Sequence, residues 1–211
     1  MSEFASAGYT AGQLNAMVKR LKKQGGEDGP DSFLRGELIV SKPGQRWQEH
    51  GGIIYLPPVT SDGTTGSQWV DRLSAKGFRL SDYAKRVLLS DDFKPTVGET
   101  TEIAVPKGML FEDNERITKK IRALADLLKF TKPNPEVACL IRENFTDKEI
   151  EAMGLWWIIT MHEPIVSDGY PSLLSASRRD DGLWLNACCD DPGSWWTRNY
   201  GFAFAVSQVS S

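Results

Sequence analysis

The stretch Leu155–Met161, which reads LWWIITM, decides the fold. It is apolar except for Thr160, and most of its residues are aromatic or β-branched. Residues of these types favour strands, and an apolar run of this length is typical of a strand that is buried in the core. We therefore predict a buried central strand here and place the rest of the chain around it.

Upstream of this strand, apolar residues recur mostly at helical spacing. Four of them follow the i, i+3, i+4, i+7 pattern near the N-terminus: Leu14, Met17, Val18 and Leu21. With N-cap and stop signals, the same reasoning predicts helices over residues 10–24, 64–77, 81–89, 113–130, 133–144 and 146–153. Residues 24–32 are expected to form a loop. Short strands are expected over residues 37–40, 53–56 and 100–110.

Downstream of Glu163 the pattern changes. The apolar segments 173–177, 183–187 and 202–206 are short, and turns rich in Asp, Gly and Pro separate them. This pattern predicts a small antiparallel sheet with hairpins. The fold class is therefore expected to be α+β, with helices in the N-terminal two-thirds and a small antiparallel sheet in the turn-rich C-terminal region.

Length and charge exclude several classes of protein. The chain has 211 residues, and 25 Lys and Arg oppose 28 Asp and Glu, which gives a formal net charge of -3. General nucleic-acid binders usually carry a basic excess, so we expect no nucleic-acid partner. No apolar run reaches the length of a membrane span, and the N-terminus lacks the apolar core of a signal peptide. We expect no membrane insertion and a cytoplasmic or virion-associated protein, with its oligomeric state left open.

The three cysteines do not form a disulfide framework, because their number is odd and two are adjacent. Cys139 lies in an apolar helical pattern and is expected to be buried. Cys188 and Cys189 could form a redox or metal pair, but no CxxC motif accompanies them. A reduced pair in a surface segment is the favoured interpretation.

Motifs for enzyme chemistry are absent from the sequence: there is no GxGxxG after a strand, no P-loop, no GxSxG and no HExxH. His162-Glu163 could act as an acid–base pair, but a histidine that closes a buried strand is more often structural. Asp180-Asp181 and Asp190-Asp191 could bind Ca²⁺, yet each lies in a turn, where aspartate is common for conformational reasons. We expect no catalytic residue, no metal ligand and no cofactor.

The last quarter of the chain has an unusual composition. Residues 1–163 contain 36 Lys, Glu, Gln and Met residues, whereas residues 164–207 contain none. At the upstream frequency about ten would be expected there. A codon that ends in a pyrimidine encodes none of Lys, Glu, Gln, Met or Trp, so randomising the adenines of AAC or AAT codons would produce this depletion. Trp184, Trp195 and Trp196 would then be fixed residues, either core or rigid aromatic anchors of a binding surface.

The same region carries a resemblance to a known family. The segments that carry it are Ile150–Trp157, Leu173–Ala176, Asp180–Gly182, Trp184-Leu185 and Gly201–Ser207. In these segments the chain resembles the variable proteins of diversity-generating retroelements, particularly those of archaeal viruses and small-genome microbes. The similarity covers most of the chain.

The resemblance implies a C-type lectin-like fold of the formylglycine-generating-enzyme type. In that family a reverse transcriptase copies a template repeat with errors at adenines, and the mutated copy replaces the 3′ end of the gene. The fold then displays the variable side chains as a ligand-binding surface. Formylglycine-generating enzymes separate the two cysteines that bind copper, whereas Cys188 and Cys189 are adjacent, so that activity is not carried over. The acidic and Asn ligand motif of calcium-dependent lectins is also not matched in this sequence.

The resulting prediction is a non-enzymatic, receptor-like protein that binds a protein or cell-surface ligand. We expect a single C-type lectin-like domain over residues 1–211, with a variable ligand-binding region at residues 164–207. The candidate variable positions can be reached by such codons and are expected at the surface. They are Ser177, Arg179, Leu183, Asn186, Cys188, Cys189, Asp191, Ser194, Thr197 and Asn199. The expected scaffold of the site consists of Trp184, Trp195, Trp196, Phe202 and Phe204.

Two alternatives remain at this point. One is a thiol- or metal-dependent enzyme of the formylglycine-generating-enzyme fold that uses Cys188, Cys189, His162 or Asp190. The other is an interaction domain without diversification, which shares the fold but shows no hypervariable positions.

Overall fold

The computed structural model describes residues 10–25, 27–35, 45–179 and 181–206. The chain divides into two compact units, residues 1–45 and residues 46–211. The expectation of a single domain over residues 1–211 stays a prediction.

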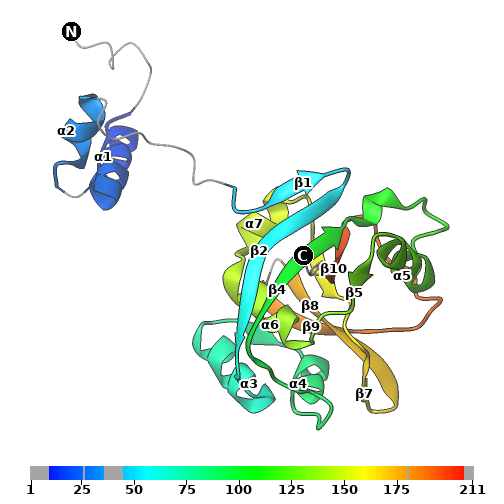
Figure 1. The fold of residues 1–211 in the computed structure, drawn as a ribbon. Helices are drawn as coiled ribbons and strands as arrows, with labels where there is room; N and C mark the ends of the chain where they lie inside the picture. Colours follow the sequence, from blue (N-terminus) through cyan, green and yellow to red (C-terminus); the bar gives the residue numbers. More distant parts are fainter. Residues whose placement is uncertain (1–9, 26, 36–44, 180, 207–211) are drawn as a thin grey trace. The chain divides into compact units, whose positions relative to one another are not determined.

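The first unit contains a pair of helices, α1 (Ala11–Gly25) and α2 (Gly29–Leu34), drawn in blue in Figure 1. The predicted cap is present, because the Thr10 hydroxyl accepts a hydrogen bond from the Gln13 amide at 3.3 Å. The loop expected at residues 24–32 was wrong in part. Pro30 stands in the first turn of α2, where its missing N–H costs no hydrogen bond. The strand expected at residues 37–40 lies outside the described residues.

The second unit is built on one ten-stranded mixed sheet (Figure 1). Its strands are β1 (Gln48–His50), β2 (Ile53–Asp62), β3 (Arg79–Leu80), β4 (Val97–Pro106), β5 (Phe130–Thr131), β6 (Trp157–Thr160), β7 (Ile165–Ser167), β8 (Tyr170–Arg179), β9 (Gly182–Cys189) and β10 (Tyr200–Val206). The main path through the sheet runs β1-β2-β4-β10-β6-β8-β9-β3, while β5 pairs with β10 and β7 with β8.

Strand β6 lies in the interior of this sheet, as the apolar run predicts. It pairs in parallel with β10, in the register Phe202↔Ile159, and antiparallel with β8. Ile158 and Ile159 are both fully buried although their side chains point to opposite faces. The prediction of a buried central strand is confirmed, and both faces of the sheet are covered at this point.

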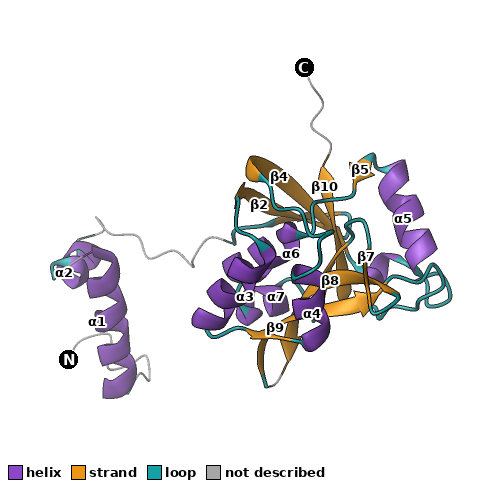
Figure 2. Cartoon of the chain, turned by 90° about the horizontal axis from the view of Figure 1, so that it is seen from below, coloured by secondary structure: helices purple, strands orange, loops and turns teal. Residues whose placement is uncertain are grey.

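Helices cover the two faces unequally. The larger core cluster joins Ile158, Leu174 and Leu185 of the sheet to residues of α3 (Gly66–Ala75), α4 (Asp82–Leu88), α6 (Glu136–Asn144) and α7 (Asp147–Ala152). The smaller cluster lies on the opposite face, where Ile121 and Ala125 of α5 (Thr118–Leu127) pack with Ile159 and Phe202. Figure 2 shows α5 apart from the group formed by the other four helices.

The predicted fold class was wrong. The expected C-type lectin-like α+β arrangement placed helices in the N-terminal two-thirds and a small antiparallel sheet in the C-terminal region. Instead, strands from both halves of the chain form one large mixed sheet, and β10 joins β4 of the first half to β6 of the second. The sequence pattern identified the C-terminal strands, but it could not identify their partners, because strand pairing is decided by contacts between distant segments.

The sequence predicted helix starts correctly where the N-cap residue bonds residues that follow it closely in the chain. Thr65 and Thr146 both form capping boxes, with Gln68 and Glu149 respectively, and Ser81 caps α4. The prediction failed at Asp113, which was expected to start a helix over residues 113–130. Asp113 instead accepts a hydrogen bond from Arg116 at 2.9 Å, and α5 begins at Thr118.

Candidate functional site

A row of large and small side chains crosses four adjacent strands on the face of the sheet that α5 covers only in part. The strand register aligns Tyr200 of β10 with Trp157 of β6, Trp157 with Ser177 of β8, and Ser177 with Trp184 of β9. Because residues at matching register positions share a face, this row places three aromatic side chains and one hydroxyl on a single surface. Residues that lie far apart in the sequence therefore meet here.

Trp157 and Tyr200 form a flat aromatic platform at one end of the row. Their ring centroids lie 5.0 Å apart, and the ring planes differ by 5°. Both side chains are half-buried, so part of each ring faces solvent. Burial also raises the pKa of the Tyr200 hydroxyl, which keeps it neutral at physiological pH.

Trp184 lies at the other end of the row, between two arginines. The guanidinium carbon of Arg79 lies 5.6 Å from the indole centroid and that of Arg179 lies 5.2 Å from it. The indole N–H donates to the Asp181 carboxylate at 3.0 Å. Asp181 also pairs with Arg79 at 3.2 Å, so one carboxylate fixes both the ring and a guanidinium above it. Cation–π contacts of this kind hold the indole in a defined orientation.

A cleft of about 610 Å³ opens at this end of the sheet. Its lining combines aromatic rings with charged groups: Trp156, Trp157, Arg178, Arg179, Asp181 and Tyr200. Arg178 pairs with Glu151 at 3.0 Å, whereas Arg79 and Arg179 share the single carboxylate of Asp181. Within the described residues, the three arginines around the cleft are thus all engaged by carboxylates.

Buried polar contacts hold the row from below. The amide of Asn186 donates to the Ser177 hydroxyl at 2.8 Å, and Ser177 is fully buried. The backbone carbonyl of Ser177 also accepts a hydrogen bond, at 3.3 Å, from the guanidinium of Arg142 in α6. Arg142 is itself fully buried, and burial lowers its pKa, although Asp147 at 2.9 Å favours the charged form. These contacts fix the β8 and β9 backbones under the half-buried aromatic rings.

The structure does not bring the ten candidate variable positions onto one surface. Four are exposed: Arg179, Cys189, Asp191 and Thr197. Four are partly buried: Leu183, Cys188, Ser194 and Asn199. Side chains alternate along β9, so Leu183 and Cys189 point to the face opposite Asn186 and Cys188. The role of these positions in ligand binding stays a prediction.

The surface exposure expected for Ser177 and Asn186 was wrong, because Ser177 is 0% and Asn186 is 7% exposed. Ser177 sits in the middle of the sheet, with Trp157 and Trp184 beside it on the neighbouring strands. Its small side chain is enclosed by these larger neighbours. The turn signals that suggested exposure begin only after Arg179, where the β8–β9 hairpin turns.

The expected scaffold residues fall into two groups. Trp184 belongs to the row, whereas Trp196, Phe202 and Phe204 lie in the smaller core cluster beneath α5. The Trp196 indole N–H donates to the Thr118 hydroxyl at 2.9 Å, which anchors the segment before β10. Trp195 belongs to neither group. Its side chain is 68% exposed, and its backbone forms an isolated antiparallel bridge with Ile117.

Of the six residues that line the cleft, sequence reasoning placed only Arg179 in the binding site. It missed five: Trp156, Trp157, Arg178, Asp181 and Tyr200. Trp157 was assigned to the core because it lies in the apolar run. The adjacent pair Trp156-Trp157 at the start of the buried strand was the available signal, because the end of a strand is less enclosed than its middle.

Three residues of the enzyme alternative, Cys188, His162 and Asp190, each contact other polar groups. The Cys188 thiol contacts the Ser175 hydroxyl at 3.6 Å, and burial raises its pKa to about 11, which disfavours the reactive thiolate. His162 is fully buried, and its Nε2 accepts a hydrogen bond from the Leu174 amide at 2.9 Å. Asp190 pairs with Arg122 at 2.7 Å.

Within the residues that the structure describes, no group of three or more His, Cys, Asp or Glu side chains could hold a metal ion. Of the acidic turn pairs proposed for Ca²⁺, Asp181 bonds Trp184 and Asp190 bonds Arg122, while Asp180 lies outside the described residues.

Comparisons with known proteins identify no relative: no protein-family model, no curated protein and no solved structure matches the chain. Among the described residues, no helix is both long and apolar enough to cross a membrane.

Proposed function

We propose that this protein is a non-enzymatic binding protein, and that its ligand contacts the row formed by Trp157, Tyr200 and Trp184 and the cleft beside it. The observation that carries the proposal is the alignment of these rings across four adjacent strands, next to a cleft of about 610 Å³. Tryptophan, tyrosine and arginine are the residue types that dominate binding energy in protein interfaces. Here all three types stand together on a rigid sheet.

The surroundings of the row support binding more than catalysis. The arginines lie against the Trp184 ring, and the carboxylate of Asp181 is occupied by the indole N–H. Such an arrangement orients side chains for contact, and none of the contacts described along the row pairs a nucleophile with a base. A protein or cell-surface ligand that presents an acidic or aromatic group would match the aromatic platform and the arginines beside it.

We also propose that exposed positions of residues 164–207, of which Arg179 lines the cleft, are diversified around the fixed aromatic row through a retroelement that serves proteins of the kind that the sequence resembles. The absence of Lys, Glu, Gln and Met from residues 164–207 supports this proposal, and that segment forms β7 to β10. The structure limits which positions could vary without loss of the fold. Arg179, Asp191 and Thr197 are exposed, whereas Ser177 is enclosed and would accept only small side chains.

The binding proposal is tested by selection from a library of random 12-residue peptides displayed on phage, with the full chain as the immobilised protein. We expect enriched peptides whose affinity falls at least tenfold in Trp184→Ala and in Arg179→Ala. Trp195→Ala is the matched control, because Trp195 is exposed outside the row, and it should leave affinity within twofold. If no peptide is enriched, or if Trp184→Ala binds as well as the wild type, the row is not the binding surface.

The diversification proposal is tested by deep sequencing of the gene from its native population, together with its downstream flank. We expect differences in the codons of exposed positions such as Arg179, Asp191 and Thr197, and a near-copy that differs from the gene only where the copy has adenine. An invariant tail without any template copy would refute diversification and would leave the binding proposal standing.

The double variant Cys188→Ser and Cys189→Ser distinguishes the enzyme alternative from the binding proposal. The binding proposal expects an unchanged far-ultraviolet circular dichroism spectrum and at most an altered choice of ligand. Loss of a bound metal, measured by elemental analysis of the purified protein, would instead favour a thiol- or metal-dependent enzyme.

A further inference from the structure

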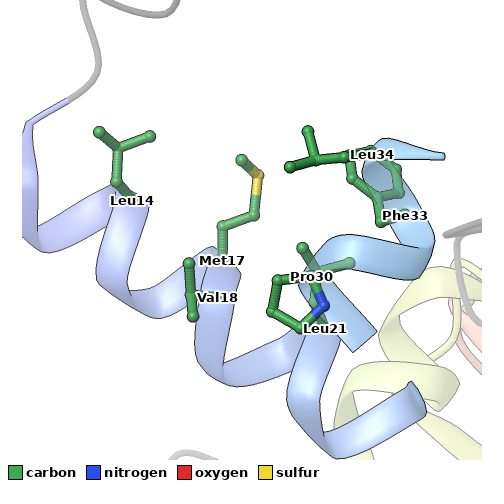
Figure 3. Close-up of a pocket in the computed structure, with 7 residues that line it drawn as sticks. All are labelled: Leu14, Met17, Val18, Leu21, Pro30, Phe33 and Leu34. Atoms are coloured by element: carbon green, nitrogen blue, oxygen red, sulfur yellow. The ribbon is translucent and has the colours of Figure 1, made fainter. Parts of the chain in front are cut away.

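Two of the hollows in this chain differ in what they offer a ligand. The groove of the first unit, about 280 Å³ in volume, is lined by seven apolar side chains of α1 and α2 (Figure 3). In the same unit Lys22 pairs with Glu27. An apolar lining does not define the chemistry of a partner. The cleft of the second unit does, because its lining contains polar groups with fixed directions as well as aromatic rings.

Arg178 brings a hydrogen-bond donor without an acceptor to this cleft. Its Nη1 atom pairs with Glu151 Oε1 of α7 at 3.0 Å, whereas its Nε atom is buried and has no hydrogen-bond partner among the described residues. The edge of a guanidinium formed by Nε and Nη2 binds a carboxylate through two parallel hydrogen bonds. The Arg178 side chain is 26% exposed and lines the cleft, so this edge is the part of the lining that an acceptor group would satisfy.

Trp156 provides an exposed aromatic ring beside this arginine. Its side chain is 54% exposed and lines the same cleft. The two residues are neighbours through the backbone, since the Arg178 amide donates to the Trp156 carbonyl at 2.9 Å. A tryptophan exposed to this extent adds little to the core, and tryptophan is a common anchor of binding surfaces. The stacked rings of Trp157 and Tyr200 form a further part of the lining.

The acidic residue of the lining, Asp181, already has donors for both of its oxygens. Oδ1 accepts from the Trp184 indole at 3.0 Å, and Oδ2 pairs with Arg79 at 3.2 Å. Within the described lining, the buried polar atom without a partner is therefore a donor, the Nε of Arg178. A volume of about 610 Å³ lies in the range of pockets that hold a drug-sized group, which leaves room for a ring and a carboxylate together.

We propose that the cleft binds a carboxylate that stands next to an aromatic ring on a peptide ligand. The carboxylate bonds the Nε and Nη2 edge of Arg178, and the ring packs against the indole of Trp156. This assignment rests on the proposed binding function and names the part of the ligand that the cleft recognises. A planar carboxylate matches one guanidinium edge. A phosphate dianion would need a further cation, and Arg179 is already paired with Asp181.

The test starts from random 12-residue peptides displayed on phage, with the full chain as the immobilised protein. Enriched peptides are expected to carry Asp or Glu within two residues of Phe, Tyr or Trp. The most enriched peptide is synthesised with an amidated C-terminus, together with a form in which Asn or Gln replaces its acidic residue. Isothermal titration calorimetry should show that the amide form binds about tenfold more weakly, because it loses the charge-assisted hydrogen bonds to Arg178.

A double-mutant cycle separates contact with the carboxylate from a general loss of structure. Arg178→Lys keeps a positive charge near Glu151 but lacks the two-donor edge. It should weaken binding of the acidic peptide about tenfold and change that of the amide form by less than about twofold, since a purely structural effect would weaken both forms equally. Arg86→Lys is the matched control, because Arg86 also pairs with a carboxylate, that of Asp168, and does not line the cleft.

The carboxylate can belong to an acidic side chain or to the end of a peptide. A shortened peptide that ends at its aromatic residue is therefore measured as the free acid and as the amide. Binding of the free acid alone assigns the carboxylate to the C-terminus, and binding of the amidated acidic peptide assigns it to a side chain. Both results support the proposal.

Three results would overturn the proposal: enriched peptides without an acidic residue, equal weakening of both forms by Arg178→Lys, or tighter binding when phosphotyrosine replaces the acidic residue. If Trp184→Ala still weakens the same peptides about tenfold, the binding function stands and only the carboxylate assignment fails. If no peptide is enriched, both fail.

Discussion

At the scale of single residues, His162 shows how burial fixes a protonation state. Its side chain is fully enclosed at the end of β6, with Nδ1 donating to the Glu163 carbonyl at 2.6 Å and Nε2 accepting from the Leu174 amide at 2.9 Å. Burial lowers its pKa to about 4, from an ordinary value of 6.5. Both ring nitrogens have partners only when the ring is neutral, so the fold selects the neutral form.

This pKa predicts a loss of stability in acid. The unfolded chain takes up the proton near pH 6.5, whereas the folded chain does so near pH 4, so stability is present above pH 6.5 and falls as the pH drops toward 4. The shift corresponds to about 3 kcal/mol of unfolding free energy. His162→Gln should remove this part of the pH dependence in urea unfolding measured between pH 4 and 7. His50→Gln, at an exposed site, should keep the slope of the wild type; equal slopes in all three proteins would show that His162 does not titrate on unfolding.

At the scale of elements, the contact between α3 and α4 depends on a glycine. Gly66 begins α3, and a Cβ atom placed on it would lie 1.7 Å from the Leu88 carbonyl oxygen at the end of α4. The obstacle is backbone, so a side-chain rotation cannot relieve it. The capping box of Thr65 fixes the start of α3 at this point, and the two helices meet closer than any other residue would allow.

Gly66→Ala is therefore expected to destabilise the second unit by about 2 kcal/mol or more, although alanine normally favours a helix over glycine by about 1 kcal/mol. Gly193→Ala is the control within the same unit, because the nearest atom to its added Cβ, Asp191 Oδ1, lies 3.5 Å away. Thermal unfolding followed by tryptophan fluorescence measures both variants, since all seven tryptophans lie in the second unit. A midpoint equal to the wild type would mean that α4 shifts freely away from α3.

At the scale of the whole molecule, β10 determines how the second unit holds together. It pairs with β4 on one side and with β6 on the other, so it links the β1-β2-β4 part of the sheet to the β6-β8-β9-β3 part. Gly201 stands at this link. A Cβ atom there would lie 2.6 Å from Val105 Cγ1 and 2.8 Å from Leu155 Cδ1, one on each side of the strand.

Because one strand connects both parts, we expect the second unit to unfold in a single transition, with tryptophan fluorescence and near-ultraviolet circular dichroism giving the same urea midpoint. Gly201→Ala should lower the unfolding free energy by about 1 to 3 kcal/mol without splitting the transition. Gly193→Ala, in the loop before β10, should change it by less than about 0.5 kcal/mol. Two separate transitions in the wild type would show that the parts of the sheet fold independently.

The sequence predicted the parts of the fold that depend on neighbouring residues. Thr65, Ser81 and Thr146 cap helices because their hydroxyls bond amides three residues ahead. Pro57-Pro58 was expected to end a strand at Leu56, yet β2 continues to Asp62. The register with β4 shifts between Leu56 and Val59, so the two prolines lie where the regular pairing is interrupted. That β4 is the partner strand cannot be inferred from the local sequence.

The candidate site was predicted only in outline. Trp184 and Arg179 were identified from the composition of residues 164–207. In the structure Arg179 lines the cleft, and Trp184 lies against Arg179. Trp157 and Tyr200 were missed, because they belong to strands that meet only through parallel pairing of β6 with β10. The Trp157 ring forms a platform only because Tyr200 lies beside it on the next strand, and the sequence does not show which strand is the neighbour.

By itself, the sequence determined the buried strand around Ile158 and Ile159, the capped helices, and the hairpin between β8 and β9. These features follow from hydrophobic periodicity, capping hydrogen bonds and turn geometry, all of which act over a few residues. The tertiary structure alone decided that strands of both halves form one mixed sheet and that Tyr200, Trp157, Ser177 and Trp184 align across it. Strand order and register depend on the packing of whole faces, and many distant pairings satisfy the same local pattern.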